Sequence, residues 1–223
     1  MRRFHRRLAK LFAICLLPAC LLAAAPPAAT AQNAELSAAD RETVERVQRH
    51  IEAIDTLRAG FRQRSSNGTR ATGRVWIDRP GKVRFDYDKP SDTVMIANGS
   101  WLLYFDRQQQ QTSYVPVDET PLWPLLKAEV DILDAETFSV AEVARADGRV
   151  RVTVARGDVR RGEPGSLELY FRDDPLALTR WRLVDQQGTV TVVDLTGVER
   201  GVEIDAAKFD FDALDLPEEP GGK

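Results

Sequence analysis

The sequence predicts an α+β protein, in which about ten short antiparallel strands form a strongly curved sheet around one N-terminal helix and a short helical insertion. Three observations predict this fold. Residues 37–57 carry apolar side chains at helical spacing, and two regions, 61–115 and 149–203, alternate short apolar segments with turn residues. A proline-bracketed apolar cluster at 121–126 separates these two strand-rich regions.

Residues 1–31 have the composition of an export signal. Five basic residues precede an apolar stretch from Leu11 to Ala25, which is too short to span a bilayer, and Ala29-Thr30-Ala31 fits a cleavage site of small residues. We therefore expect residues 32–223 to form a single mature domain outside the cytoplasm. An alternative is a lipoprotein signal, in which Cys20 would be acylated.

Removal of the leader makes the protein acidic. The whole chain has 31 Lys and Arg against 34 Asp and Glu, and loss of the five basic leader residues leaves 26 against 34, a formal net charge of −8. The sequence indicates no concentrated basic face, so we expect neither nucleic-acid binding nor polybasic binding to anionic lipid. Both cysteines, Cys15 and Cys20, lie in the leader, so the mature domain has no disulfide and no thiol chemistry.

The first mature element is predicted to be an amphipathic helix of about five turns. Ser37, followed three residues later by Asp40, has the pattern of a capping box. Apolar residues then recur at three- and four-residue intervals with charged residues between them, which predicts one buried face. They are Val44, Val47, Ile51, Ile54 and Leu57, and we expect the helix to end before Gly60.

Six strands are predicted after the helix. Residues 83–87 show the period-two pattern most clearly, because Val83, Phe85 and Tyr87 fall on one face and charged residues on the other. The uninterrupted apolar run at 101–105 requires cover on both faces of its strand. The predicted strands span residues 61–64, 72–78, 83–87, 93–97, 101–106 and 111–115.

The middle of the chain is predicted to be helical and the rest to return to strands. Proline and acidic residues interrupt the apolar pattern after residue 120, so we expect short helices at 127–133 and 135–143. Residues 217–223 are expected to form a loose tail. The later strands are predicted at 149–155, 167–172, 178–185, 189–195 and 198–203, with glycine and Asp-Pro turns between them.

Candidate catalytic groups are few. The sole histidine of the mature chain, His50, is expected on the charged, solvated side of the helix, with no cysteine or second histidine to join it. Carboxylate pairs such as Asp86 with Asp88 lie at strand edges or turns, where solvated carboxylates are ordinary. We therefore expect no catalytic residue, no metal site and no cofactor. An enzyme acting on acyl chains is the last of the alternatives.

The sequence has more large apolar side chains than the core of a simple sheet requires. A strongly curved sheet leaves an inner concavity, and proline-broken helices suit a lid better than a permanent core. Ordinary core packing is the alternative interpretation for each of these side chains. The candidates for the cavity lining are Trp76, Phe85, Tyr87, Met95, Trp101, Leu103, Phe105, Leu122, Trp123, Leu125, Leu126 and Trp181.

The mature chain resembles the LolA family of periplasmic lipoprotein carriers over essentially its whole length. The family fold implies an unclosed, strongly bent antiparallel half-barrel of about ten to eleven strands, with helices over its concave apolar face. The resemblance rests on Leu57-Arg58-Ala59-Gly60-Phe61-Arg62-Gln63, on Ile77 and Arg79-Pro80-Gly81-Lys82 with Arg84-Phe85, on Pro90 and Asn98-Gly99, on Leu102, Tyr104 and Asp106, on the cluster Pro121 to Leu126, and on Asp205-Ala206-Ala207-Lys208-Phe209 with Phe211.

The resemblance also implies a function and roles for individual residues. Members of the family are not enzymes: they take acylated lipoproteins from an ABC-type release complex in the inner membrane and deliver them to a receptor at the outer membrane. The matching arginine, Arg79, is expected to hold the lid through hydrogen bonds to backbone groups of the capping helices. The loop of Pro80, Gly81, Lys82 and Val83 is expected to contact the release complex, although it lacks the bulky aromatic residue of some relatives. A monomer without stable membrane insertion is expected.

Several alternatives stay open for the same architecture. One is a sensor or regulatory domain that binds a signalling protein instead of cargo, and another is a carrier of a different exported lipid. For Arg79, the alternative is an ordinary surface charge at the end of a strand.

Overall fold

The computed structural model describes residues 36–133, 138–155, 160–212 and 214. The expectations for the leader, for Cys20 and for the tail at 217–223 fall outside these residues. The chain forms a helix, α1 (Ala38–Glu52), and then the first six strands. These are β1 (Thr56–Ser65), β2 (Arg70–Asp78), β3 (Lys82–Tyr87), β4 (Thr93–Asn98), β5 (Trp101–Asp106) and β6 (Gln111–Pro116).

Short helical turns separate these strands from five more. A 3₁₀ turn, η1 (Val117–Glu119), leads into α2 (Trp123–Leu126), and a second 3₁₀ turn, η2 (Ala206–Phe209), follows the last strand. The later strands are β7 (Ser139–Ala146), β8 (Arg149–Ala155), β9 (Leu167–Arg172), β10 (Ala177–Val184) and β11 (Val190–Arg200).

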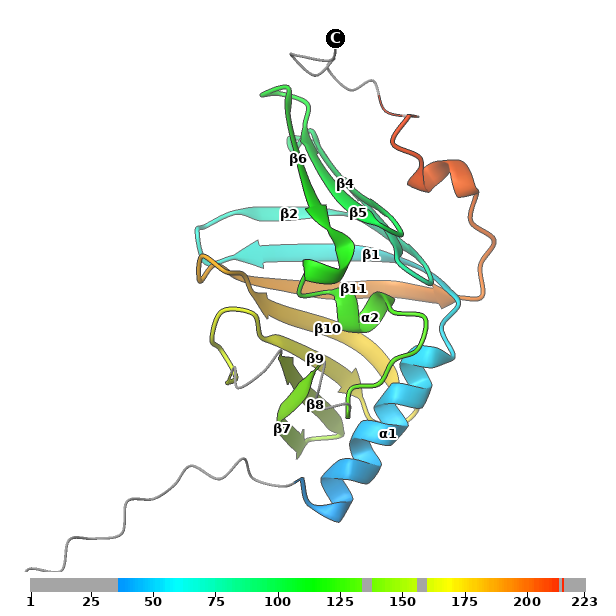
Figure 1. The fold of residues 1–223 in the computed structure, drawn as a ribbon, viewed down its shortest axis with the longest axis vertical. Helices are drawn as coiled ribbons and strands as arrows, with labels where there is room; N and C mark the ends of the chain where they lie inside the picture. The colour runs from blue at the N-terminus through cyan, green and yellow to red at the C-terminus, as the bar shows by residue number, and fades with distance from the viewer. Residues whose placement is uncertain (1–35, 134–137, 156–159, 213, 215–223) are drawn as a thin grey trace, which may run out of the picture. The chain divides into compact units, whose positions relative to one another are not determined.

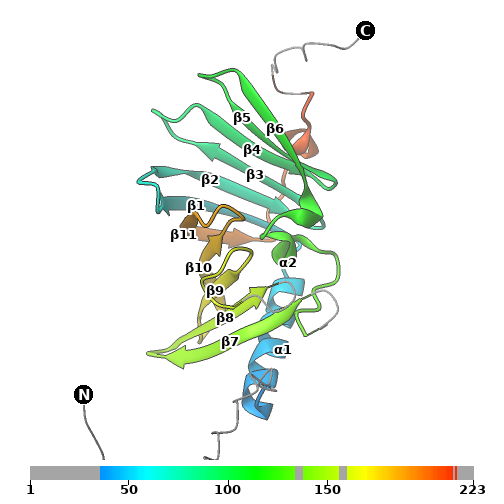
Figure 2. The ribbon, with the colours of Figure 1, turned by 60° about the vertical axis from the view of Figure 1, so that its left-hand side comes forward.

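The eleven strands of the described residues belong to one antiparallel sheet, which confirms the predicted fold class. The strand order is β6-β5-β4-β3-β2-β1-β11-β10-β9-β8-β7, so two meanders join where β1 pairs with β11. β6 and β7 form opposite edges of the sheet, which is therefore unclosed (Figure 1). Figure 2 shows how strongly the sheet bends between these edges.

Helix α1 begins as predicted but ends earlier. The Ser37 side chain accepts a hydrogen bond of 3.1 Å from the backbone N–H of Asp40, and Val44, Val47 and Ile51 form the buried face. The helix stops at Glu52, so the predicted continuation to Gly60 is wrong. Residues from Thr56 onward instead enter β1, because sheet pairing on both sides satisfies their backbone groups better than another helical turn would.

The predicted helices after α2 are also wrong. Residues 127–133 contain no helix. Of the helix predicted at 135–143, residues 135–137 lie outside the described residues, and Ser139 onward forms β7 against β8. The two strands predicted at 189–195 and 198–203 are one strand, β11, whose length matches that of its neighbour β1. From Ser139 onward and in β11, pairing with a neighbouring strand of the sheet overrides the local pattern.

The sheet buries apolar side chains on both faces. On one face, α1 and α2 cover strands from both meanders, and Phe61, Phe85, Tyr87 and Trp181 form an aromatic cluster with ring centroids 5.1 to 6.2 Å apart. Gly73 allows the backbone to approach this cluster, because a Cβ there would lie 2.8 Å from the Phe61 ring. We call this the capped face. On the other face, the segment around η2 covers β2 to β5.

Candidate functional site

Arg79 lies in the loop between β2 and β3, where the sheet, α1 and α2 meet. Its backbone N–H donates a hydrogen bond of 2.9 Å to the carbonyl of Asp55, and the N–H of Gly81 donates one of 2.8 Å to the carbonyl of Leu126 at the end of α2. Gly81 has φ +77°, and a Cβ at this position would lie 2.8 Å from the Cα of Gly99. A glycine is therefore required for the loop to pack this closely against its neighbours.

The guanidinium group of Arg79 joins the C-terminal ends of both helices. Nη1 donates to the carbonyl oxygens of Ile51 and Ile54, at 2.6 and 3.3 Å. Nη2 donates to the carbonyl oxygen of Lys127 and, at 3.2 Å, to that of Ala128. Carbonyls at helix ends lack partners within the helix, and arginine is the side chain that offers the most donors to them.

The environment of Arg79 has two opposing electrostatic effects. Burial lowers the pKa of Arg79, while the nearby carboxylates of Glu52 and Asp55 raise it again. The group stays charged because the ordinary pKa of arginine is far above neutral pH. The Nε atom of Arg79 is buried without a hydrogen-bond partner among the described residues. The contact is therefore held by Nη1 and Nη2 alone.

Two further side chains hold the segment after α2 against α1. We call residues 127–133 the strap, and α2 together with the strap the cap. The carboxylate of Glu52 accepts a hydrogen bond of 3.3 Å from the backbone N–H of Val130. The side-chain carbonyl of Gln48 accepts one of 3.2 Å from the N–H of Ile132. Arg79 thus binds strap carbonyls, whereas Gln48 and Glu52 bind strap amides.

The cap packs its apolar side chains into the capped face. Leu125 and Leu126 of α2 and Val130 and Ile132 of the strap are all buried there. A recess of about 140 Å³ remains beside α2, lined in part by Pro124, Phe138 and Leu167. Because the side chains of the cap fill this face, a large apolar ligand would have to displace the cap in order to bind.

The structure places most predicted lining residues on the capped face. Trp123, Leu125 and Leu126 come from the cap itself, Leu122 lies just before it, and the others lie on the strands beneath it. Residues that are buried in this cluster or packed against it are Phe85, Tyr87, Met95, Leu122, Trp123, Leu125, Leu126 and Trp181.

Four of the predicted lining residues are on the opposite face of the sheet. Trp76, Leu103 and Phe105 pack in the cluster around η2, and Trp101, on the same side of β5 as Leu103, is 47% exposed. On β5, side chains alternate between the two faces, so Leu102 packs on the capped face while Trp101, Leu103 and Phe105 lie on the other. The prediction failed for Trp76, Leu103 and Phe105 because the C-terminal segment supplies cover that the sequence pattern did not reveal. That cover comes mainly from Phe209 and Leu214, which are both buried. The prediction failed for Trp101 because strand alternation puts this side chain on the same face, where it stays largely exposed.

The predicted contact loop is only partly accessible. Val83 is 2% exposed and belongs to the capped-face core, so its assignment to a contact surface is wrong. Gly81 is buried as well. Pro80 is exposed, and Lys82 is half-buried beside Asp78, whose carboxylate lies 3.1 Å from the ammonium group.

His50 is half-buried, in contrast to the predicted solvated position. Its ring packs edge-to-face on Phe171 with centroids 5.9 Å apart. Burial lowers the pKa of His50, and the positive charge of Arg200 lowers it further.

Within the described residues, no three His, Cys, Asp or Glu side chains cluster as metal ligands would. In the same part of the chain, no helix is both long and apolar enough to cross a membrane.

Gln48 and Glu52 were not among the site residues predicted from the sequence. The available signal was their spacing of four residues, which puts both on one side of α1. Their partners could not have been inferred, because the strap was expected to be helical and its amides would then bond within the helix.

Comparison with known proteins gives a consistent result. The family model described as outer membrane lipoprotein carrier protein LolA matches residues 52–212. An outer-membrane lipoprotein carrier protein from Azotobacter vinelandii is 26% identical over 211 residues, which cover 91% of this chain and 94% of the relative. A protein with the same description from Pseudomonas syringae pv. tomato is 28% identical over 182 residues, which cover 78% and 85% of the two chains.

Solved structures with a similar backbone include a LolA superfamily protein from Nitrosomonas europaea, with a TM-score of 0.42 and 9% identity. That match covers 76% of this chain and 98% of the other. A crystal structure of MucB has a TM-score of 0.44 and 16% identity, and the match covers 78% of this chain and 63% of that one.

Proposed function

The chain belongs to the LolA family of outer membrane lipoprotein carrier proteins, and from this membership we propose that it carries lipoproteins across the periplasm. In this proposal residues 32–223 are the carrier domain, and the acyl chains of the cargo are held between the capped face and the displaced cap. The protein performs no chemical reaction on its cargo.

The energetics of acyl chains explain why a carrier is needed. Each CH₂ group moved from water into an apolar environment contributes about 0.8 kcal/mol, so a single long acyl chain in water costs on the order of 10 kcal/mol. A lipoprotein carries up to three such chains. Their transit through an aqueous compartment is feasible only if the chains stay covered.

The observation that carries the proposal is the set of hydrogen bonds from Arg79 to both helix ends. One side chain connects α1 to the strap, so movement of the Arg79 loop would release the cap. Leu125 and Leu126 would then leave the capped face, and acyl chains would take the place of these side chains. Apolar surface is covered both before and after this exchange, so the empty carrier need not hold a large empty cavity.

The direction of transport requires other proteins. A bilayer covers acyl chains at least as well as the capped face does, so loading must be driven by an external machine. In this proposal an ABC-type release complex of the inner membrane loads the carrier, and a receptor at the outer membrane accepts the cargo. The accessible part of the Arg79 loop, mainly Pro80 and Lys82, is the proposed contact with the release complex.

The proposal is tested by incubating the mature protein with spheroplasts and assaying lipoproteins in the soluble fraction. We expect the wild-type protein to release lipoproteins as a soluble complex and to pass them on to outer membranes. Arg79→Leu should load but deliver poorly, because the cap no longer closes behind the departing cargo. Arg74→Leu is the matched control, since Arg74 lies exposed on β2.

Two results would contradict the proposal. Absence of any soluble complex with the wild-type protein would exclude the carrier function. Equal delivery by Arg79→Leu and Arg74→Leu would leave the carrier function standing but would remove the assigned role of Arg79.

A further inference from the structure

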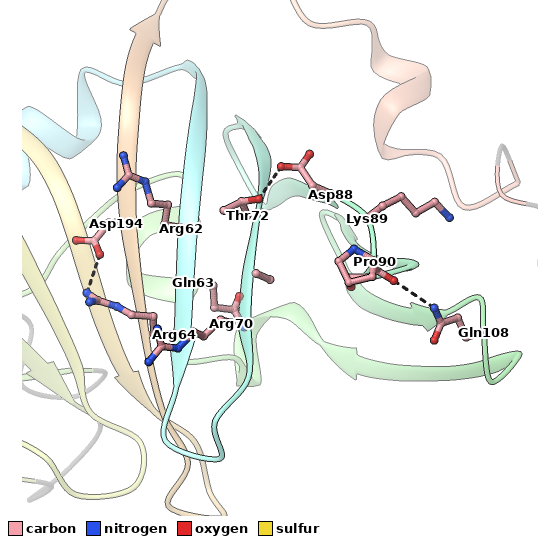
Figure 3. A pocket seen from close by; sticks show the side chains of 12 residues that line it. Arg62, Gln63, Arg64, Arg70, Thr72, Asp88, Lys89, Pro90, Gln108 and Asp194 are labelled. Atoms are coloured by element: carbon pink, nitrogen blue, oxygen red, sulfur yellow. Dashed lines mark hydrogen bonds and ion pairs between the residues drawn. The ribbon is translucent and has the colours of Figure 1, made fainter.

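A groove of about 680 Å³ lies at the end of the hairpin formed by β1 and β2. One wall consists of residues 62–64 of β1 and 70–72 of β2, and the other of residues 88–91 after β3 together with Gln108 (Figure 3). The second wall is held in place by two hydrogen bonds. Thr72 donates to the carboxylate of Asp88 at 2.7 Å, and Gln108 donates to the carbonyl of Pro90 at 3.2 Å.

The groove is cationic although the mature protein is acidic. Its lining contains Arg62, Arg64, Arg70 and Lys89 but only two carboxylates, those of Asp88 and Asp194. Arg64 pairs with Asp194 at 2.9 Å, and Lys89 pairs with Asp92 at 2.6 Å. Among the described residues, Arg62 and Arg70 form neither an ion pair nor a side-chain hydrogen bond.

The positions of these arginines work against the stability of the sheet. Arg64 and Arg70 are directly opposite each other in the register of β1 and β2, and like charges in such positions are destabilising. Arg62 lies two residues along β1 on the same face. A bound anion would remove this repulsion, and local conflicts of this kind are expected at functional sites.

The groove is separate from the cap. Phe61, on the opposite side of β1 from Arg62, packs on the capped face, so Arg62, Arg64 and Arg70 face away from α1 and α2. A ligand in the groove therefore does not require the cap to move. Binding there is independent of the carrier function proposed above.

We propose that this groove binds an acidic peptide segment of a partner protein. Arginine offers a fork of donors that matches carboxylates, and a groove between two walls accommodates an extended chain. An anionic bilayer is the less suitable partner. Charges are screened within about 8 Å at physiological salt, so a peptide in the groove meets mainly the local arginines, whereas a flat bilayer would also meet the surrounding acidic surface.

The test is fluorescence anisotropy of a labelled hexaglutamate peptide titrated with the mature protein, with hexaglutamine as the uncharged probe. We expect the wild-type protein to bind hexaglutamate and not hexaglutamine. The double variant Arg62→Gln/Arg70→Gln should bind about tenfold more weakly, because two charge-assisted contacts are lost. The control Arg41→Gln/Arg149→Gln removes the same charge at exposed sites elsewhere, and should change affinity less than about twofold.

Three results would overturn the proposal. The first is that the wild-type protein does not bind hexaglutamate, and the second is that both double variants bind it equally weakly. The third is that binding which depends on Arg62 and Arg70 is stronger to vesicles with 30 mol% phosphatidylglycerol than to the peptide. A stability measurement gives an independent test of the repulsion between Arg64 and Arg70. Arg70→Gln should leave the melting temperature of the protein unchanged or raise it, because it removes this repulsion. A clear decrease in the melting temperature would mean that Arg70 has a structural role instead.

Discussion

Gln48 and Ile132 are 84 residues apart in the sequence, yet the side-chain oxygen of Gln48 lies 3.2 Å from the backbone nitrogen of Ile132. One helical turn later, Glu52 forms the equivalent contact with Val130. Both contacts are formed only when the strap lies against α1. Together with the hydrogen bonds of Arg79, they hold the strap against α1.

Loss of these acceptors should loosen the strap. In Glu52→Leu, the part-buried N–H of Val130 loses its partner, which costs about 1–3 kcal/mol. We expect amide hydrogen exchange at Val130 and Ile132 to accelerate by about tenfold or more, while the amides of β9 stay protected. Glu52→Gln keeps an acceptor oxygen and is the matched control. Unchanged exchange in Glu52→Leu would show that the contact does not hold the strap.

Arg79 should not be replaceable by lysine. A lysine retains the positive charge but has a single nitrogen, so it cannot reach the carbonyls of Ile51 and Ala128 together. We expect Arg79→Lys to lower the free energy of unfolding by about 1–3 kcal/mol in urea denaturation. Arg74→Lys, on the strand β2 that precedes the Arg79 loop, should change it by less than about 0.5 kcal/mol. Equal values for the two variants would contradict this prediction.

Truncation of a cap residue should cost less than truncation of a residue within the sheet. Leu169→Ala on β9 should destabilise the protein by about 2–5 kcal/mol, because it leaves a cavity in the core. Leu126→Ala should cost less and should increase binding of a hydrophobic dye, because in the proposed function the cap opens while the sheet stays folded. Urea denaturation and dye fluorescence measure the two effects. Equal costs without added dye binding would mean that the cap is an inseparable part of the core.

The buried carboxylate of Glu168 should make stability depend on pH. Burial by itself would raise the pKa of Glu168, but hydrogen bonds from Tyr170 and Arg161 and the charge of Arg182 lower it below its ordinary value of 4.5. A lowered pKa means that the ionised group stabilises the folded state above about pH 4.5, and that this contribution is lost as the pH falls through the lowered value.

This effect can be measured by comparing Glu168→Gln with the wild-type protein. At pH 7 the variant should be less stable by about 3 kcal/mol, because the arginines around it lose their charged partner. The difference in the free energy of unfolding between the variant and the wild-type protein should become smaller as the pH is lowered below 4.5. Glu203→Gln changes an exposed residue and should have the same free energy of unfolding as the wild-type protein at every pH. A difference that stays constant with pH would rule out an ionic origin.

Much of the fold could be predicted from local patterns. The alternation at Val83, Phe85 and Tyr87 identified both the strand and its buried face, and Ser37 with Asp40 identified the start of α1. The failures share one cause. Leu57 suits a helix by its spacing, but strands on both sides of β1 recruit it into the sheet. Such partners are distant in sequence and leave no local signal.

The candidate site was predictable in part. Arg79 and the apolar residues of α2 were identified, whereas Gln48 and Glu52 were not. The cationic groove was also missed, because Arg62, Arg70 and Lys89 come from separate segments in a chain that is acidic as a whole.

The sequence by itself determined the succession of elements, the apolar character of the strands and the net negative charge of the chain, because these depend on residue type and on spacing over a few positions. Only the tertiary structure decided which face each large apolar residue covers, where α1 ends, and which charges meet. The physical reason is that burial and ion pairing depend on neighbours in space. Trp76 and Phe85 have similar chemistry, yet the bend of the sheet and the C-terminal segment put them in different cores.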